Sequence, residues 1–212
     1  MKKLILSLFI MLLFQPGLVG ANPQTEPKIQ VEIIIFQSLA LRGWTEEYWP
    51  DLDGIISTAD SRRIAGLDGY AQRLDPDQRT LLEEAGKMTT DRGYDILAHL
   101  AWQQPLRSNQ LAMPVLIDPS LQLRRANVSR LLGKIRIYQE RFIHADVQME
   151  LDRQIPTRIR ENFANHQQIP IEWLPESWRF KIEESRRVRY GQIHYLDHPI
   201  FGVLIKIDRV AN

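Results

Sequence analysis

The sequence predicts a single α+β domain made of a mainly antiparallel β-sheet and one well-defined packed helix, following a cleaved signal peptide. Several segments alternate apolar and polar residues with a period of two, as strands do. One segment, 75–93, instead combines helix-start signals with apolar residues at helical spacing. No internal repeat, low-complexity tract or linker divides the chain, so we expect residues 22–212 to form one domain.

Residues 1–21 have the pattern of a secretory signal peptide. Two lysines precede an apolar run over 4–14, and 19–21 supply small residues at a cleavage position. The alternative is a retained membrane anchor, but so short a run cannot cross about 30 Å of hydrocarbon. Position 22 is Asn rather than Cys, so a lipid attachment point is absent there. We therefore expect cleavage after Ala21 and a periplasmic protein with no membrane span.

The segment 29–36, IQVEIIIF, is the first expected strand. Its β-branched and apolar residues are typical of a strand that is buried on both faces, which predicts a central place in the sheet. Residues 37–74 lose this pattern, and we expect an irregular connection across the surface. Trp44 and Trp49 in this connection could stack on sugar rings, but anchoring to the core is favoured because aromatic burial dominates such contacts.

The segment 75–93 is the expected helix. Asp75 can cap its start, Pro76 fits the first helical position, and Gln78 stands where a capping box needs it. Gly93 is expected to end the helix. The apolar stripe that should rest on the sheet consists of Leu81, Leu82, Ala85 and Met88.

The remaining strands follow from the same period of two. In the segment 94–104, His99 should point away from the face shared by Tyr94, Ile96, Ala98, Leu100 and Trp102. The segment 133–151 is too long for one strand, so we expect a bulge or a hairpin near 139–141. Residues 156–175 should form a loop with a short helix. Three further strands are expected at 178–190, 192–196 and 203–207.

The stretch IHYLDHPIFG, residues 193–202, is expected to be a hairpin connection. The residues assigned to this structural turn are Asp197, His198, Pro199 and Gly202, because Asp, Pro and Gly are typical turn residues. Asp197 should cap the turn through its own backbone. A metal site is the alternative, in which His144 and Asp146 would complete the shell, but zinc needs three or four converging ligands. We expect neither a metal nor another cofactor.

Composition excludes several classes of protein. The chain has 27 basic and 26 acidic residues, and this near-neutral balance argues against nucleic-acid binding. With no cysteine, disulfides cannot contribute to stability. The mature chain lacks a Gly-x-Ser-x-Gly elbow, a Ser-x-x-Lys pair and a His-Glu-x-x-His helix. We therefore expect a protein that is not an enzyme.

Four ordered blocks together resemble the CsiV family of peptidoglycan-binding periplasmic proteins of Gram-negative bacteria. The blocks are IQVEIIIFQ, GYDILAHLAWQQP, GKIRIYQERFIHADVQMEL and RRVRYGQIHYLDHPIFGVLIKI. The resemblance covers most of the mature chain and is strongest near the C-terminus, whereas residues 42–73 match nothing in it. It implies a non-enzymatic protein that binds peptidoglycan and supports wall assembly by a bifunctional penicillin-binding protein through its outer-membrane lipoprotein activator. It supplies no ligand residues.

Candidate ligand residues follow from the chemistry of the wall. Stem peptides offer carboxylates that suit guanidinium groups, and sugars offer flat faces that suit aromatic rings. The residues nominated on this basis are Arg136, Arg141, Arg186, Arg187, Arg189, His194 and Tyr195. Their arginines would form one basic face if the segments 133–151 and 178–190 pair. The alternative is a solvated face on which acids such as Glu140, Glu183 and Glu184 match the arginines.

Two other functions stay open at this stage. The protein could be a protein-only adaptor that docks on an envelope lipoprotein through a strand edge or the loop 44–49. It could also be a metal-dependent wall hydrolase built on His144, Asp146, His194 and His198.

Overall fold

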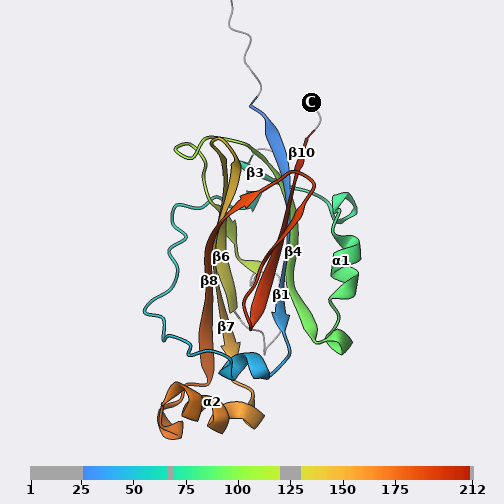
Figure 1. Ribbon diagram of the computed structural model, residues 1–212. Coiled ribbons are helices and arrows are strands. Elements are labelled where there is room, and N and C mark those ends of the chain that lie inside the picture. The colour runs from blue at the N-terminus through green and yellow to red at the C-terminus, as the bar shows by residue number, and fades with distance from the viewer. Residues whose placement is uncertain (1–25, 66–68, 120–129, 211–212) are drawn as a thin grey trace, which may run out of the picture.

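The computed structural model describes residues 26–65, 69–119 and 130–210, which form two β-sheets packed face to face (Figure 1). A short helix covers the outer face of one sheet, and a second helix lies at one end of the molecule (Figure 1). The α+β fold class is therefore confirmed. The predicted signal peptide lies outside the described residues. Within the described ranges, no helix is long and apolar enough to cross a membrane.

The six-stranded sheet has the order β2-β3-β4-β1-β10-β9, and the four-stranded sheet has the order β5-β6-β7-β8. Neighbouring strands pair antiparallel except β2 and β3, which are parallel. The strands of the first sheet are β1 (Lys28–Ser38), β2 (Ile64–Ala65), β3 (Ala71–Arg73), β4 (Tyr94–Pro105), β9 (Ile193–Leu196) and β10 (Phe201–Arg209). Those of the second are β5 (Val115–Ile117), β6 (Arg130–Gln139), β7 (Ile143–Gln154) and β8 (Ser177–Val188).

The helical segments of the described chain are short. The α-helices are α1 (Leu82–Lys87) and α2 (Arg160–Gln167). The 3₁₀ segments are η1 (Arg42–Thr45), η2 (Pro76–Gln78), η3 (Thr90–Arg92), η5 (Thr157–Ile159) and η6 (Ile171–Trp173). Helix α2 is the short helix expected within 156–175.

The central position predicted for the first strand is confirmed. β1 pairs with β10 on one side and with β4 on the other. Its residues Val31, Ile33 and Ile35 enter the core between the sheets, whereas Ile34 and Phe36 pack in a second cluster beneath α1. Burying each such isoleucine stabilises the fold by about 1.5–3 kcal/mol. The run is apolar at successive positions because both faces of β1 are covered.

The prediction of one helix over 75–93 is wrong, because the segment is divided into η2, α1 and η3. The capping box of Asp75 and Gln78 is present but serves only η2, since Arg79 is extended. The next two backbone N–H groups bond to the Glu32 carboxylate instead of continuing a helix. Leu82 is 56% exposed, so it is not part of the buried stripe. The rest of that stripe, Leu81, Ala85 and Met88, packs on the sheet as expected.

A register shift in β4 corrects the predicted face of that strand. Phe36 pairs with Ile96 and Ile35 pairs with Ala98, so Leu97 is the extra residue of a bulge. Ile96 consequently lies on the α1 side of the sheet, while Leu97 and Ala98 both belong to the inner core. A bulge interrupts the alternation of inward and outward side chains, and the sequence pattern did not predict its position.

Two buried tryptophans anchor the long connection between β1 and β3 to the core. Trp44 is fully buried and its ring lies edge-on to Phe163 and Phe180, with centroids 5.3 and 5.1 Å away. The indole of Trp49 is also buried and donates to the Trp44 carbonyl at 3.0 Å. The expectation that these tryptophans anchor the loop is confirmed. The connection is less irregular than expected, because it contains η1 and β2.

Two predicted hairpins are confirmed. β6 and β7 pair from Arg130 opposite Asp152 to Gln139 opposite Ile143, which places the turn at 140–142. β9 and β10 pair from Val203 opposite Leu196 to Lys206 opposite Ile193, which places a turn within IHYLDHPIFG.

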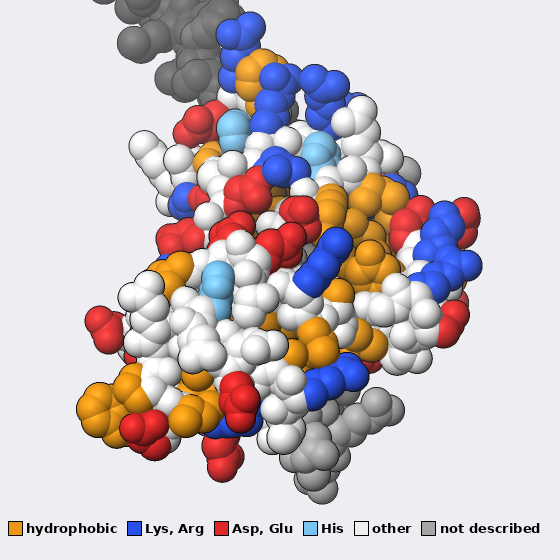
Figure 2. Space-filling model, turned by 60° about the horizontal axis from the view of Figure 1, so that its bottom comes forward, with side chains coloured by type: hydrophobic (Ala, Val, Ile, Leu, Met, Phe, Trp, Pro, Cys, Tyr) orange, Lys and Arg blue, Asp and Glu red, His pale blue; other side chains and the backbone are white. Residues whose placement is uncertain are grey.

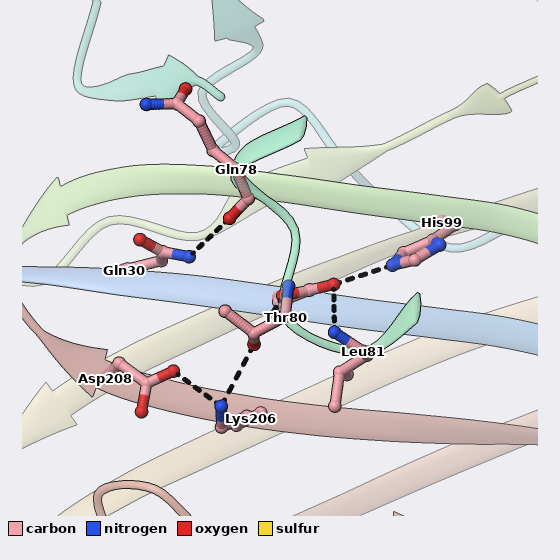
Figure 3. A network of polar contacts seen from close by, with 8 residues as sticks. Gln30, Gln78, Thr80, Leu81, His99, Lys206 and Asp208 are labelled. Atoms are coloured by element: carbon pink, nitrogen blue, oxygen red, sulfur yellow. Dashed lines mark hydrogen bonds and ion pairs between the residues drawn. The ribbon is translucent and has the colours of Figure 1, made fainter. Parts of the chain in front are cut away.

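A buried carboxylate fastens the α1 segment to the sheet (Figure 3). Glu32 lies in the middle of β1 and is 1% exposed. One of its oxygens accepts from Thr80 N–H at 2.7 Å and from the Thr80 hydroxyl at 2.9 Å. The other accepts from Leu81 N–H at 2.9 Å and from His99 Nε2 at 2.7 Å. Burial alone would raise the pKa of Glu32, but these hydrogen bonds together lower it from 4.5 to about 2.

Candidate functional site

A candidate site is a cavity of about 330 Å³ at the end of β1, the start of β4 and the turn between β9 and β10. We call it the end cavity, and its lining includes Phe36, Arg42, Arg92, Tyr94, Tyr195 and Asp197. Its lining includes residues of η1, which lies at the same end of the molecule as α2 (Figure 1). Basic, acidic and hydrophobic side chains are interspersed on this end (Figure 2).

Four aromatic rings from four strands line the end cavity: Phe36, Tyr94, Tyr195 and Phe201. Phe36 is buried. Its ring lies edge-on to Tyr94, with ring centroids 5.4 Å apart, and stacks on Tyr195, with ring centroids 6.0 Å apart. Tyr94 and Tyr195 are 39% and 42% exposed, so both keep part of their rings open to solvent. A Cβ at Gly202 would lie 2.7 Å from the rings of both Phe36 and Tyr195. Glycine is therefore required at 202 because the stacked rings lie directly over the β10 backbone.

The walls of the end cavity are held together by main-chain hydrogen bonds. Ser38 N–H, at the end of β1, donates to the Ile200 carbonyl in the β9–β10 turn at 2.8 Å. Leu39 N–H donates to the Gly93 carbonyl at 2.8 Å, which ties in the start of β4. Arg153 from β7 donates to the Ser38 carbonyl at 2.6 Å. These bonds join segments distant in sequence, so the cavity is formed without any ligand.

The charged groups of the end cavity are of both signs. Arg42 and Glu46 come from η1 and the residue after it, Arg92 comes from η3, and Asp197 comes from the β9–β10 turn. All four are exposed. Within the described part of the chain, no ion pair involves any of these four side chains. Asp197 accepts a hydrogen bond from the Tyr195 hydroxyl, which is a neutral partner. Burial, followed by this bond, raises the pKa of Tyr195, so the phenol stays a donor.

His198 forms the partition behind the end cavity. Its ring stacks on Trp49 at 4.8 Å and also contacts Phe180 and Phe201. Nδ1 accepts from Ile200 N–H at 3.1 Å, so this histidine, and not Asp197, satisfies the backbone of the turn. Burial lowers the pKa of His198 to about 4, which keeps the ring neutral at pH 7.

His198 also lines a second, smaller cavity of about 230 Å³ with Tyr48 and Trp49 on the far side of that partition. Pro199 lies against η1: a Cβ at Gly43 would come within 2.6 Å of the Pro199 carbonyl. His198 thus lies between the end cavity and the smaller cavity and lines both of them.

Arg186 and His194 lie beside the cavity rather than in it. Arg186 donates to the Tyr195 carbonyl at 2.5 Å and to Glu184 at 2.7 Å, so it positions the β9 backbone. His194 Nε2 accepts from Arg189 N–H at 3.0 Å. Burial, and then the charge of Arg186, lower the pKa of His194.

The nominated arginines are not brought together as one basic face. β6 and β8 do not pair with each other, because β7 lies between them. Arg136 and Arg187 share the outer face of the four-stranded sheet, whereas Arg186 points from the opposite face of β8. Arg136 pairs with Asp146 at 2.6 Å, and the guanidinium of Arg187 lies 3.3 Å above the Phe142 ring centre.

Arg141 also lies over Phe142, in the turn between β6 and β7. This turn is at the end of the molecule opposite α2, far from the end cavity (Figure 1). Arg189 follows β8, and its backbone N–H donates to His194 while its carbonyl accepts from Gln192 N–H. Of the seven nominated residues, only Tyr195 lines the end cavity.

The four residues of the metal-site alternative lie in separate environments. His144 stacks on Tyr138 at 5.4 Å, and Asp146 is bonded to Arg136 and to the Ser185 hydroxyl. His194 and His198 hold backbone N–H groups. Among residues 26–65, 69–119 and 130–210, no group of three or more His, Asp or Glu side chains is placed to hold a metal ion.

Sequence reasoning missed Arg42 and Arg92. Arg42 lies in the connection that no pattern could interpret, and Arg92 was read as the last turn of a helix. The one available signal was Arg92-Gly93-Tyr94, an arginine and an aromatic on either side of a glycine at a strand start. The glycine has φ +84°, a left-handed conformation that redirects the chain there.

Comparison with known proteins agrees with a binding role. The family model described as "Peptidoglycan-binding protein, CsiV" matches residues 3–210, nearly the whole chain. No curated protein and no solved structure matches the chain. Because the family match spans far more than half of the sequence, the chain belongs to the CsiV family of peptidoglycan-binding proteins.

Proposed function

We propose that this protein binds peptidoglycan in the periplasm without catalysing its cleavage, and that the end cavity is the binding site. One observation carries the proposal. Two guanidinium groups that form no ion pair with the described residues, Arg42 and Arg92, line one preformed cavity together with the partly exposed rings of Tyr94 and Tyr195. Guanidinium groups suit stem-peptide carboxylates, and aromatic rings suit sugar faces and aliphatic chains.

The competing contact surface is the outer face of the four-stranded sheet, which carries Arg136 and Arg187, together with Arg141 and Arg189 near its end. Its arginines are partly satisfied by the protein itself, through Asp146 and through the Phe142 ring. Such exposed pairs can exchange partners at little cost, so this face stays a testable alternative.

The test is co-sedimentation of residues 22–212 with purified sacculi at two salt concentrations. Wild-type protein should sediment, and binding should weaken as salt rises because charge attraction is screened. The variant Arg42→Ala plus Arg92→Ala should lose binding, whereas Arg187→Ala should keep it. The control Arg63→Ala plus Arg158→Ala removes the same charge from two exposed positions outside the cavity. Loss of binding in Arg187→Ala alone would assign the site to the outer face instead.

The proposal extends to support of wall assembly by a penicillin-binding protein through its outer-membrane lipoprotein activator, as the resemblance implies. The observation that favours a protein partner is the long edge strand β8, which ends the order of the four-stranded sheet. An extended peptide can add to such an edge by main-chain hydrogen bonds. Capture of the purified activator by the protein in the absence of peptidoglycan, and its loss when Ser185 is replaced by Pro, would test this docking mode.

A further inference from the structure

The charges of the end cavity do not pair with one another, although opposite charges elsewhere in the described chain do. Examples of such pairs are Arg107 with Glu26 at 2.8 Å and Lys134 with Asp60 at 2.9 Å. In the end cavity two guanidinium groups and two carboxylates line one hollow, and the structure shows no ion pair among them. Both signs are thus available to a ligand at the same place.

We propose that the end cavity takes an amino-acid centre that carries both a free carboxylate and a free ammonium group, as stem peptides do where they are not cross-linked. This inference rests on the proposed function and deepens it by naming the part of peptidoglycan that is bound. Arg42 and Arg92 hold the carboxylate of the ligand, and Glu46 and Asp197 hold its ammonium group. The protein therefore binds uncross-linked stem peptides in preference to glycan or to cross-linked peptides.

The size and lining of the cavity support this ligand. Its volume of about 330 Å³ is near the lower limit of small-molecule sites, which span about 300–1,000 Å³, and suits one amino-acid unit. The open parts of Tyr94 and Tyr195 offer apolar contact to an aliphatic chain between the two charged ends. The main-chain bonds to Ile200 and Gly93 hold the walls in place, so little backbone conformational entropy is lost on binding.

The charge set also argues against other ligands. A purely anionic ligand would be repelled by the two carboxylates, and an uncharged glycan chain would leave four charged groups without a partner of opposite charge. A ligand with both charges satisfies all four, and charge-assisted hydrogen bonds are roughly twice as strong as neutral ones.

The test uses soluble disaccharide-peptide monomers released from sacculi by a muramidase, with affinity measured by calorimetry. Three forms are compared: the native monomer, the monomer with its free amine acetylated, and the monomer with its carboxylates amidated. For wild-type protein, each modification should weaken binding by roughly tenfold, because each removes a set of charge-assisted hydrogen bonds.

Variants of the protein test which of its charged side chains contacts the ammonium group of the ligand and which contacts the carboxylate. Glu46→Gln plus Asp197→Asn should bind the native monomer weakly and should no longer distinguish it from the acetylated form. Arg42→Ala plus Arg92→Ala should likewise no longer distinguish the native from the amidated form. This crossed pattern is a double-mutant cycle between protein and ligand groups. Asn at 197 can still accept from the Tyr195 hydroxyl, and urea unfolding verifies that each variant is folded.

The outcomes separate this inference from the proposed function. If wild-type protein binds sacculi but binds the native, acetylated and amidated monomers equally well, the zwitterion site is refuted and peptidoglycan binding stands. Binding to peptide-free glycan chains with the same affinity would refute it too. Failure to bind sacculi at all would instead overturn the proposed function. The pair Arg63→Ala plus Arg158→Ala should behave as wild type with all three ligands.

Discussion

Replacing Glu32 with Gln should destabilise the protein strongly, although the two side chains have nearly the same shape. The carboxylate accepts four hydrogen bonds, two at each oxygen, from Thr80, Leu81 and His99. An amide has one oxygen only, and its NH₂ group would face two donors. The lowering of the pKa of Glu32 from 4.5 to about 2 corresponds to about 3 kcal/mol of stability.

The assay is urea unfolding of wild type and Glu32→Gln at pH 7 and at pH 4, with thermal unfolding as a second measurement. At pH 7 the variant should lose about 3 kcal/mol, which lowers the melting temperature by roughly 6–12 °C for a chain of this size. Because the folded-state pKa is depressed, the contribution is complete above the unfolded-state value of 4.5 and is lost as the pH falls toward 2. The difference should therefore shrink by about 1 kcal/mol at pH 4.

Two results would refute this reasoning. One is a loss smaller than about 1 kcal/mol at pH 7, since even one unsatisfied buried donor costs that much. The other is a difference that stays the same at both pH values. The control is Glu83→Gln on the exposed face of α1, whose carboxylate meets only Lys87, and we expect its unfolding curve to match wild type.

Three further predictions concern the turn and the outer face. Gly202→Ala should cost about 1–3 kcal/mol, because the new Cβ would displace the ring of Tyr195, and urea unfolding measures the loss. His198→Phe should make the stability of the protein less sensitive to acid. Burial lowers the pKa of His198 to about 4 in the folded state, whereas the unfolded chain takes up the proton near pH 6.5. The wild-type protein should therefore lose up to about 3 kcal/mol of stability between pH 6.5 and 4. An equal loss of unfolding free energy in this variant and in wild type over that pH range would contradict the assignment. Arg136→Ala should change stability by about 1 kcal/mol or less because its pair with Asp146 is partly open to solvent, and a larger shift in the urea midpoint would show that the pair is structural.

The pattern of neighbouring residues in the sequence determined several features of the fold. The apolar run of β1 required a central strand, because only a strand covered on both faces can carry consecutive β-branched residues. The Asp, Pro and Gly of IHYLDHPIFG indicated a turn between two strands, and the burial energy of indole rings favoured the entry of Trp44 and Trp49 into the core. These features depend on residues close together in the sequence or on the free energy of a single side chain.

Long-range contacts decided the rest. The helix predicted over 75–93 ends early because Glu32, almost fifty residues away, takes the N–H groups that a helix would use. The face of Ile96 depends on a bulge that forms against β1. Arg42, Arg92 and Tyr195 meet in one cavity only because η1, η3 and the β9–β10 turn fold to the same end of the sandwich. No periodicity predicts these contacts, because the groups that make them belong to residues far apart in the sequence.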